Sequence, residues 1–131
     1  MESSFQFTNP SLTQLEFLVN ELFDKENNKQ AKIKMHLSIE VEKKDNILGE
    51  AQVALTLEMG DKSADVPFYI RAVEKANFRW DQSLKENDVD SMLKQNAPAL
   101  LLSYLRPIIV QVTASSLYGA YHIPFMNFVG T

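Results

Sequence analysis

The sequence contains no cysteine and only 4 glycines, and these shortages exclude several kinds of protein. Without cysteine there is no disulfide framework, thiolate zinc site, iron–sulfur cluster or cysteine nucleophile. The glycines at positions 49, 60, 119 and 130 are too far apart to form a loop that cradles phosphate. The absence of cysteine also favours a reducing compartment, so we expect a cytoplasmic protein.

Basic clusters and clean apolar segments are missing as well. The 13 Lys and Arg residues are outnumbered by 17 Asp and Glu, and because they form no cluster we expect no nucleic acid partner. The N-terminus lacks a basic segment followed by an apolar one, which predicts no signal peptide. The most apolar segment, 97–114, is interrupted by Arg106 and Pro107, and it falls short of the roughly 20 apolar residues of a membrane span. We therefore expect no membrane insertion.

No pattern of polar residues predicts catalysis. His36 and His122 have no carboxylate or second histidine at a metal-ligand spacing, and no serine lies in a nucleophile-elbow motif. The nearest carboxylate pairs are explained by a solvated strand face and by a helix N-terminus, where negative charge is stabilising. We therefore expect no catalytic residue, no metal, no cofactor and no enzymatic activity.

The middle of the sequence alternates between apolar and polar residues. Segment 31–43 has an apolar residue at every second position, and segment 51–59 repeats the pattern after turn residues at 44–46. These two segments predict a β-hairpin. Segment 66–80 follows the turn at Gly60 and predicts a third strand.

Two features of the predicted strands are irregular. Segment 12–23 alternates only in part and predicts a weaker first strand. Glu74 occupies a position that should be apolar in segment 66–80, which predicts a bulge near residues 73–76.

After Trp80 the pattern changes to helix. We predict a short helix from Asp88 to residue 95 and a longer one from Asn96 to about Leu117, with Gly119 just past its end. Strands followed by a helix predict a single α+β domain over residues 1–131, with the helix on one face of an antiparallel sheet.

The long helix is apolar nearly all round. A stripe centred on Leu101 and Leu105 can cover the sheet, but other apolar residues lie beside or behind it. This predicts self-association, most simply as a symmetric dimer or a dimer of dimers. The alternative is a helix buried more deeply in its own protomer. The expected oligomer interface comprises Leu102, Ile109, Val110 and Leu117.

Aromatic and methionine residues near both ends exceed what we expect one sheet face and one helix to bury. They belong either to the core or to a groove that accepts apolar peptide, for which such adaptable side chains are suited. The surplus consists of Phe5, Phe7, Phe68, Phe78, Trp80, Tyr121, Ile123, Phe125, Met126 and Phe128.

The order of three alternating strands, a polar loop and the segment Asn96-Ala97-Pro98-Ala99-Leu100-Leu101-Leu102-Ser103-Tyr104-Leu105-Arg106 resembles the SecB protein-export chaperone family. The segment Pro124-Phe125-Met126-Asn127-Phe128 is similar to a proline-containing turn of that family that closes in Asn-Phe. The resemblance covers about residues 12–128. It implies a four-stranded antiparallel sheet packed on one long helix, assembled as a dimer of dimers. It also implies an ATP-independent holdase that binds unfolded preproteins in apolar grooves. The residues that match the client-binding groove are Phe68, Ile70, Phe78, Trp80, Tyr121, Ile123, Phe125, Met126 and Phe128.

This sequence departs from the family in two respects. Gln14, Leu18 and Arg71 stand where carboxylates that dock on the translocase motor are expected, which leaves binding to that motor open. The sequence also stops at Thr131, where a final helix is expected. Three other functions therefore stay open: a chaperone dedicated to one client such as an antitoxin, a module that recognises one folded or specific partner, and a carrier of a small apolar ligand.

Overall fold

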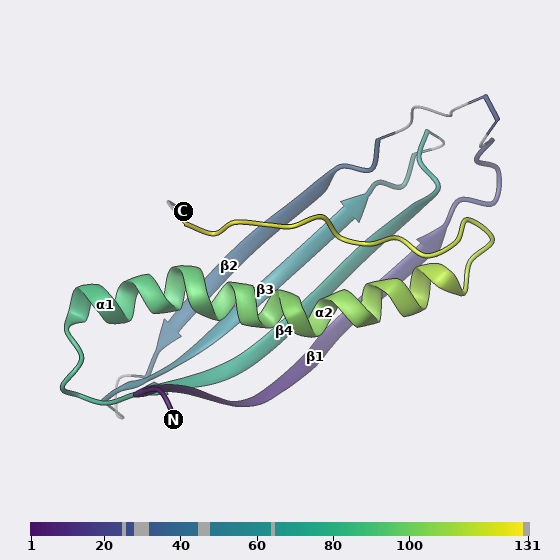
Figure 1. Cartoon of the computed structure of the whole chain (residues 1–131). Coiled ribbons are helices and arrows are strands. Elements are labelled where there is room, and N and C mark those ends of the chain that lie inside the picture. The colour runs from purple at the N-terminus through teal and green to yellow at the C-terminus, as the bar shows by residue number, and fades with distance from the viewer. Residues whose placement is uncertain (25, 28–31, 45–47, 64, 130–131) are drawn as a thin grey trace.

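The computed structural model describes residues 1–24, 26–27, 32–44, 48–63 and 65–129. Within them, β1 (Phe5–Val19), β2 (Met35–Lys43), β3 (Glu50–Gly60) and β4 (Phe68–Trp80) precede a helix made of α1 (Glu86–Ser91), the π-helical turn η1 (Met92–Asn96) and α2 (Ala97–Ala114). The strands form one antiparallel sheet in the order β1-β4-β3-β2. Figure 1 shows the helix lying diagonally across one face of this sheet. The predicted α+β class, with four antiparallel strands on one long helix, is confirmed.

The predicted hairpin corresponds to β2 and β3, which pair without interruption from Met35↔Met59 to Lys43↔Ala51. The expected strand start at Ala31 and most of the expected turn lie outside the described residues. The alternation on β3 reflects one buried face, as predicted, since every second residue is completely buried on the side of the sheet that faces the helix and the tail. Those buried residues are Ala51, Val53, Leu55, Leu57 and Met59.

Strand β1 begins at Phe5, earlier than predicted, and contains two irregularities. Its register against β4 shifts between Thr8 and Ser11 and again between Leu12 and Gln14, with Asn9 at φ 56°. These shifts lie opposite the part of β4 where a bulge was predicted, whereas β4 pairs with β3 in unbroken register. The bulge prediction was therefore wrong about the strand. Because β4 is hydrogen-bonded on both sides, the extra residues are accommodated on the edge strand instead.

The helix is continuous from Glu86 to Ala114, 29 residues, so the predicted division into two helices at Asn96 was wrong. Pro98 has no N–H and cannot form the usual hydrogen bond to the preceding turn. The π-helical turn η1 lies just before it and accommodates the missing hydrogen bond, so that the helix continues. By length and composition the helix could cross a membrane. Here its Leu101 and Leu105 side chains are fully buried in the protein core.

The chain reverses direction after the helix. The helix ends at Ala114, before the predicted Leu117, and Gly119 lies further on with φ 83°. This left-handed conformation, which glycine adopts without steric cost, helps to turn the chain back. Residues 121–128, here called the tail, then run in extended form alongside the helix over the sheet (Figure 1).

Glu74 is the unexpected member of the core. It is 2% exposed on the helix-facing side of β4, between the buried residues Ala72 and Ala76. Its neighbours across the ladders are Leu12 and Leu55, and its Oε1 has no hydrogen-bond partner among the described residues. Burial raises the pKa of this carboxyl above its ordinary value of 4.5.

We expect Glu74→Leu to stabilise the protein at neutral pH by about 1–3 kcal/mol, because an unpaired buried carboxyl is replaced by an apolar side chain of similar volume. Glu74→Gln is the control for charge. A raised pKa in the folded state contributes stability below the unfolded-state pKa of 4.5, and that contribution is lost as pH rises through the folded-state value. Urea denaturation across the acid-to-neutral range should therefore show a loss with rising pH that Glu74→Gln removes. An unchanged pH dependence would show that Glu74 is solvated in solution.

Candidate functional site

The predicted client-binding residues divide into three groups by exposure. Most of them belong to the protomer's own core: Phe68, Ile70, Phe78, Ile123 and Phe128 are 7% exposed or less. Trp80, Tyr121 and Met126 are half-buried. Phe125 is 92% exposed. The buried group is therefore closed to a client in this conformation, because the helix and the tail already cover it.

An aromatic cluster joins the N-terminus of β1 to the end of β4. The Phe5 ring stacks on Phe78 at 5.5 Å and on Trp80 at 6.1 Å, and the Phe7 ring lies 6.3 Å from both Phe78 and Tyr104. Phe5 and Phe7 were part of the sequence surplus but not of the predicted site. The register Phe5↔Trp80 and Phe7↔Phe78 that brings them here could not be predicted while β1 was expected to start at residue 12.

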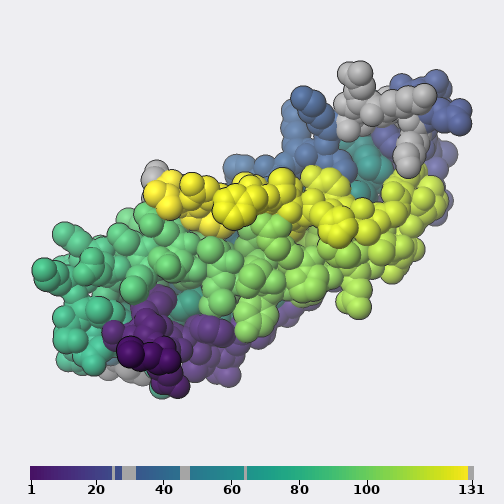
Figure 2. All heavy atoms as spheres, in the orientation of Figure 1, coloured from purple at the N-terminus to yellow at the C-terminus, as the bar shows by residue number. Residues whose placement is uncertain are grey.

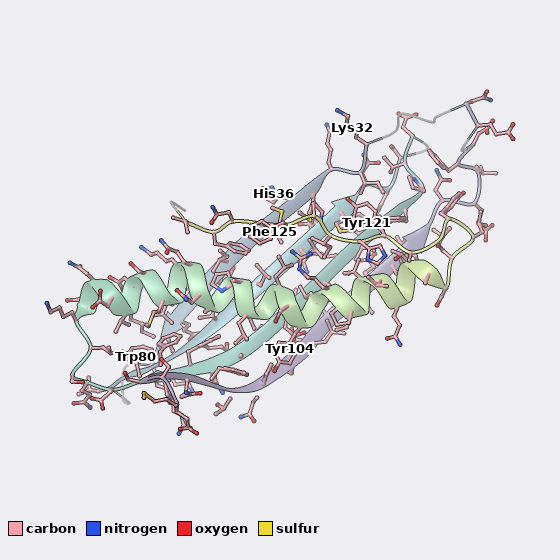
Figure 3. The ribbon with its side chains drawn as sticks, viewed as in Figure 1. Lys32, His36, Trp80, Tyr104, Tyr121 and Phe125 are labelled. Carbon is pink, nitrogen blue, oxygen red and sulfur yellow. The ribbon has the colours of Figure 1, made fainter. Side chains whose placement is uncertain are left out.

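The helix-facing side of β1 is incompletely covered. Leu12 and Leu15 are each 39% exposed, and Tyr104 of the helix, which contacts Phe7 of the same strand, is 40% exposed. We call these three residues the β1 patch. Figure 3 shows Tyr104 on the side of the helix opposite the tail, with Phe125 and Tyr121 on the tail side. The protomer thus leaves apolar side chains uncovered on both sides of its helix.

The tail is fixed to the helix by two polar side chains. The Arg106 guanidinium donates to the backbone oxygens of Ile123 and Pro124, the latter at 3.0 Å. Thr113, fully buried, accepts a hydrogen bond from the N–H of Tyr121 at 2.8 Å while donating to the backbone oxygen of Ile109 at 2.6 Å. Further along the sheet the Tyr121 ring meets Phe68 edge-on at 6.0 Å.

A hollow of about 290 Å³ lies between the helix and the last part of the tail. Phe125, which Figure 3 labels on the tail, lines this hollow and is 92% exposed, and Figure 2 shows the tail as a ridge on the helix face of the molecule. The hollow is mostly apolar, with one cation at its edge. It is lined by Ala99, Leu102, Arg106, Phe125, Met126 and Phe128.

The residues predicted for an oligomer interface do not share one surface. Leu102 and Ile109 are 2% and 0% exposed, so they are core residues of the protomer and the expectation for these two is corrected. The reason is that the tail covers a side of the helix that the sheet alone would leave exposed. Val110 is half-buried and Leu117 is 76% exposed, and both remain accessible to a partner.

The uncovered face of α2 carries no charge. Arg106 is the only charged residue between Ala97 and Ala114, and its guanidinium is bonded to the tail. The exposed positions are Ala99, Ser103, Tyr104, Pro107, Gln111 and Ala114, with Leu100 and Val110 half-buried among them. Such a face is unusual for a helix that meets only water.

The sheet side that faces away from the helix is polar and carries mixed charge. Arg71 donates to Gln14 Oε1 and its Nε lies 4.0 Å from Glu58 Oε1, and Tyr69 donates to Glu58 Oε2 at 3.2 Å. Burial, followed by the Glu58 charge, raises the pKa of Tyr69. Arg71 thus sits within a network at the position where an acidic residue was expected for motor docking. Within the described residues no group of His, Asp and Glu is arranged to hold a metal ion.

This sheet topology, with a long helix and an extended C-terminal segment on one face, defines a SecB-like fold. With a TM-score of 0.70 and 11% identity, over 94% of this chain and 88% of the other, it matches the SecB-like chaperone Rv1957 of Mycobacterium tuberculosis, solved in complex with a ChAD peptide from the Rv1956 HigA1 antitoxin. A protein of unknown function from Streptococcus agalactiae is also similar, with a TM-score of 0.52 and 15% identity over 92% and 97% of the two chains. No curated protein sequence matches this chain.

The family is established by sequence. The model of the family described as preprotein translocase subunit SecB matches residues 15–131, which is most of the chain. The chain therefore belongs to the SecB family, as the resemblance of its motifs predicted.

Proposed function

We propose that this protein is a holdase chaperone that keeps unfolded or unassembled polypeptides from aggregating, without ATP, cofactor or catalysis. Membership of the SecB family supports a chaperone role. The observation that carries the proposal is the apolar surface that the folded protomer leaves uncovered on both sides of its helix. It comprises the β1 patch and the hollow that Phe125 lines. The absence of cysteine fits work in the cytoplasm.

Weak apolar contacts are suited to this task. Each buried Å² contributes roughly 25 cal/mol, so several short contacts along one unfolded chain sum to useful affinity without requiring a particular sequence. Ordering the client opposes binding, which keeps the complex reversible. Bound clients can then be released without an energy source.

We further propose that the protomers assemble into a homo-oligomer, most simply a dimer of dimers, through the C-terminal half of the uncharged outer face of α2, from Pro107 to Ala114, which leaves Tyr104 and Ala99 to the client surface. A protomer that exposed this face to water would carry an apolar patch of the kind that normally marks an interface. Val110 and Leu117 belong to the proposed contact. An assembly would also bring several client surfaces together, so that one long polypeptide could bind at more than one of them.

The proposal is tested by mixing the protein in stoichiometric excess with a denatured model protein, without nucleotide, and following aggregation by light scattering. We expect suppression by the parent protein and an affinity for the unfolded chain about tenfold lower for Phe125→Ser, because one large apolar contact is lost. Leu22→Ser is the matched control, since Leu22 is 90% exposed in the loop after β1 and away from the hollow. Equal suppression by both variants would exclude Phe125 as a client contact, and no suppression by the parent for any client would exclude the holdase.

A chaperone dedicated to one client is the second candidate. It is favoured by the fold match to a SecB-like chaperone solved with an antitoxin peptide. The Arg71 network on the outer sheet face, in place of acidic motor-docking residues, points in the same direction. Tight binding of one neighbouring gene product, together with indifference to generic unfolded chains, would select this function over the general one.

A further inference from the structure

The tail binds the rest of its own protomer as an extended peptide binds a receptor. Ile123 and Phe128 are 6% and 7% exposed and act as apolar anchors, while Phe125 between them points outward at 92%. The segment has no regular secondary structure of its own. Its attachment to the helix uses apolar burial together with the side-chain hydrogen bonds of Arg106 and Thr113.

Arg106 recognises the tail through its main chain. Its planar guanidinium donates to the carbonyl oxygens of two consecutive residues, Ile123 and Pro124. Every polypeptide presents such oxygens, so this contact does not depend on the side chains of the bound segment. The positions that Ile123 and Phe128 occupy require only that the bound segment has apolar side chains there. A site built in this way accepts any extended apolar segment.

We propose that the strip of the protomer beneath the tail is a polypeptide-docking surface whose resting occupant is the tail, and that an extended apolar segment of a client displaces the tail and takes over the Arg106 hydrogen bonds. This proposal rests on the proposed holdase function and deepens it. The client makes its first contact at the open hollow beside Ala99 and Met126, because an apolar side chain can enter there before the tail has moved.

Exchange of this kind makes the tail an internal competitor. A segment fixed mainly by side chains opens at a lower free energy than one inside a strand ladder. The apparent affinity for a client is then the intrinsic affinity reduced by the fraction of protomers whose tail has left the strip. Loosening the tail should therefore strengthen client binding, and fixing it should weaken binding.

The first experiment fixes the tail reversibly. Because the chain has no cysteine, Ala99→Cys with Met126→Cys supplies the only two thiols, and both positions line the same hollow. A cleavable bismaleimide joins them. We expect binding of a reduced and alkylated unfolded test protein, measured by fluorescence anisotropy, to fall at least tenfold when the link is intact and to recover when it is cleaved.

The second experiment separates the contribution of the tail from that of the Arg106 hydrogen bonds. Ile123→Ala loosens the tail and keeps Arg106, so we expect client affinity to rise several-fold. Arg106→Gln removes the donor from the tail and from the client alike, so the two effects oppose each other and we expect client affinity to stay closer to the parent value than in Ile123→Ala. A nitroxide on Val129→Cys, a position that is 71% exposed, should gain mobility when the parent background binds the test protein. Thermal melting confirms that each variant is folded.

The outcomes distinguish the two levels of the proposal. If the linked and unlinked proteins bind the test protein equally, or the mobility of the Val129 probe does not change on binding, the client docks elsewhere; the tail exchange is then overturned while the holdase stands. If the unlinked protein binds no unfolded chain at all, both proposals are overturned. Loss of binding on linking, with recovery on cleavage, supports the exchange even if Ile123→Ala fails to fold.

Discussion

Gly60→Ala is expected to destabilise the protomer by more than about 3 kcal/mol, although it adds a single methyl group. Gly60 ends β3 with φ 70°, and a Cβ built there would lie 1.9 Å from the backbone oxygen of Phe68. A backbone atom in the paired strand cannot move aside as a flexible side chain could. The added carbon therefore forces the β3–β4 ladder apart where Gly60 pairs with Tyr69.

Gly119→Ala is the matched control for this prediction. Gly119 has a similar φ of 83°, but a Cβ at this position meets nothing within 4 Å. The substitution should cost only the strain of a left-handed alanine, about 1 kcal/mol. Urea or thermal denaturation of the two variants separates the contributions. Equal losses would mean that the turn after Gly60 relaxes and that the contact with Phe68 is not rigid.

The strands that could be predicted are those with one wet and one buried face. On β2, β3 and β4 a period of two follows directly from that arrangement, and the register of the hairpin follows from its pattern. Strand β1 was harder to predict because the register shifts after Thr8 and Leu12 change which alternate residues face the helix. The alternation of apolar and polar residues therefore looks weak in the sequence. The same shifts lie opposite the region of Glu74, which has a position on the buried side of the alternation but whose charge favoured a bulge over burial.

The helix illustrates a different limit. Its composition correctly predicted that something besides the sheet covers it, but composition cannot say on which side. Leu102 and Ile109 were assigned to a partner subunit, and they are instead buried within the protomer. Only the chain reversal near Gly119 brings the tail back to this side. The same reversal explains why Ile123 and Phe128 are core residues while Phe125 remains exposed.

The exposed part of the proposed client surface was likewise only partly predictable. An excess of aromatic residues was visible in the sequence, but which of them remain accessible depends on how many neighbours each one finds after folding. Phe78 is covered by Phe5 and Phe7, whose strand pairing was not foreseen. The hydrogen bonds of Arg106 to the tail carbonyls join residues far apart in the sequence and have no sequence signal at all.

Aspartate at two adjacent positions of α2 is expected to have opposite consequences. Ile109 is 0% exposed, so Ile109→Asp places an unpaired carboxylate in the core and should unfold the protomer, a loss of about 3–5 kcal/mol or more. Val110 lies on the uncharged outer face and is half-buried. Val110→Asp should leave the protomer folded but dissociate the proposed homo-oligomer, because the charge would be desolvated only in the contact between protomers.

Circular dichroism with thermal melting reports folding, and size-exclusion chromatography with light scattering reports assembly. Leu48→Asp is the control, because it introduces the same charge at a position that is 79% exposed and lies beside Glu86, at the opposite end of the helix from Val110. A parent protein that is monomeric at all concentrations would remove the outer face of α2 from consideration as an interface. If instead Val110→Asp is folded and still assembled, protomers associate through another surface. The exposed β1 patch is then the next place to introduce a charge, since Leu12 and Leu15 lie on an edge strand that a second copy can reach.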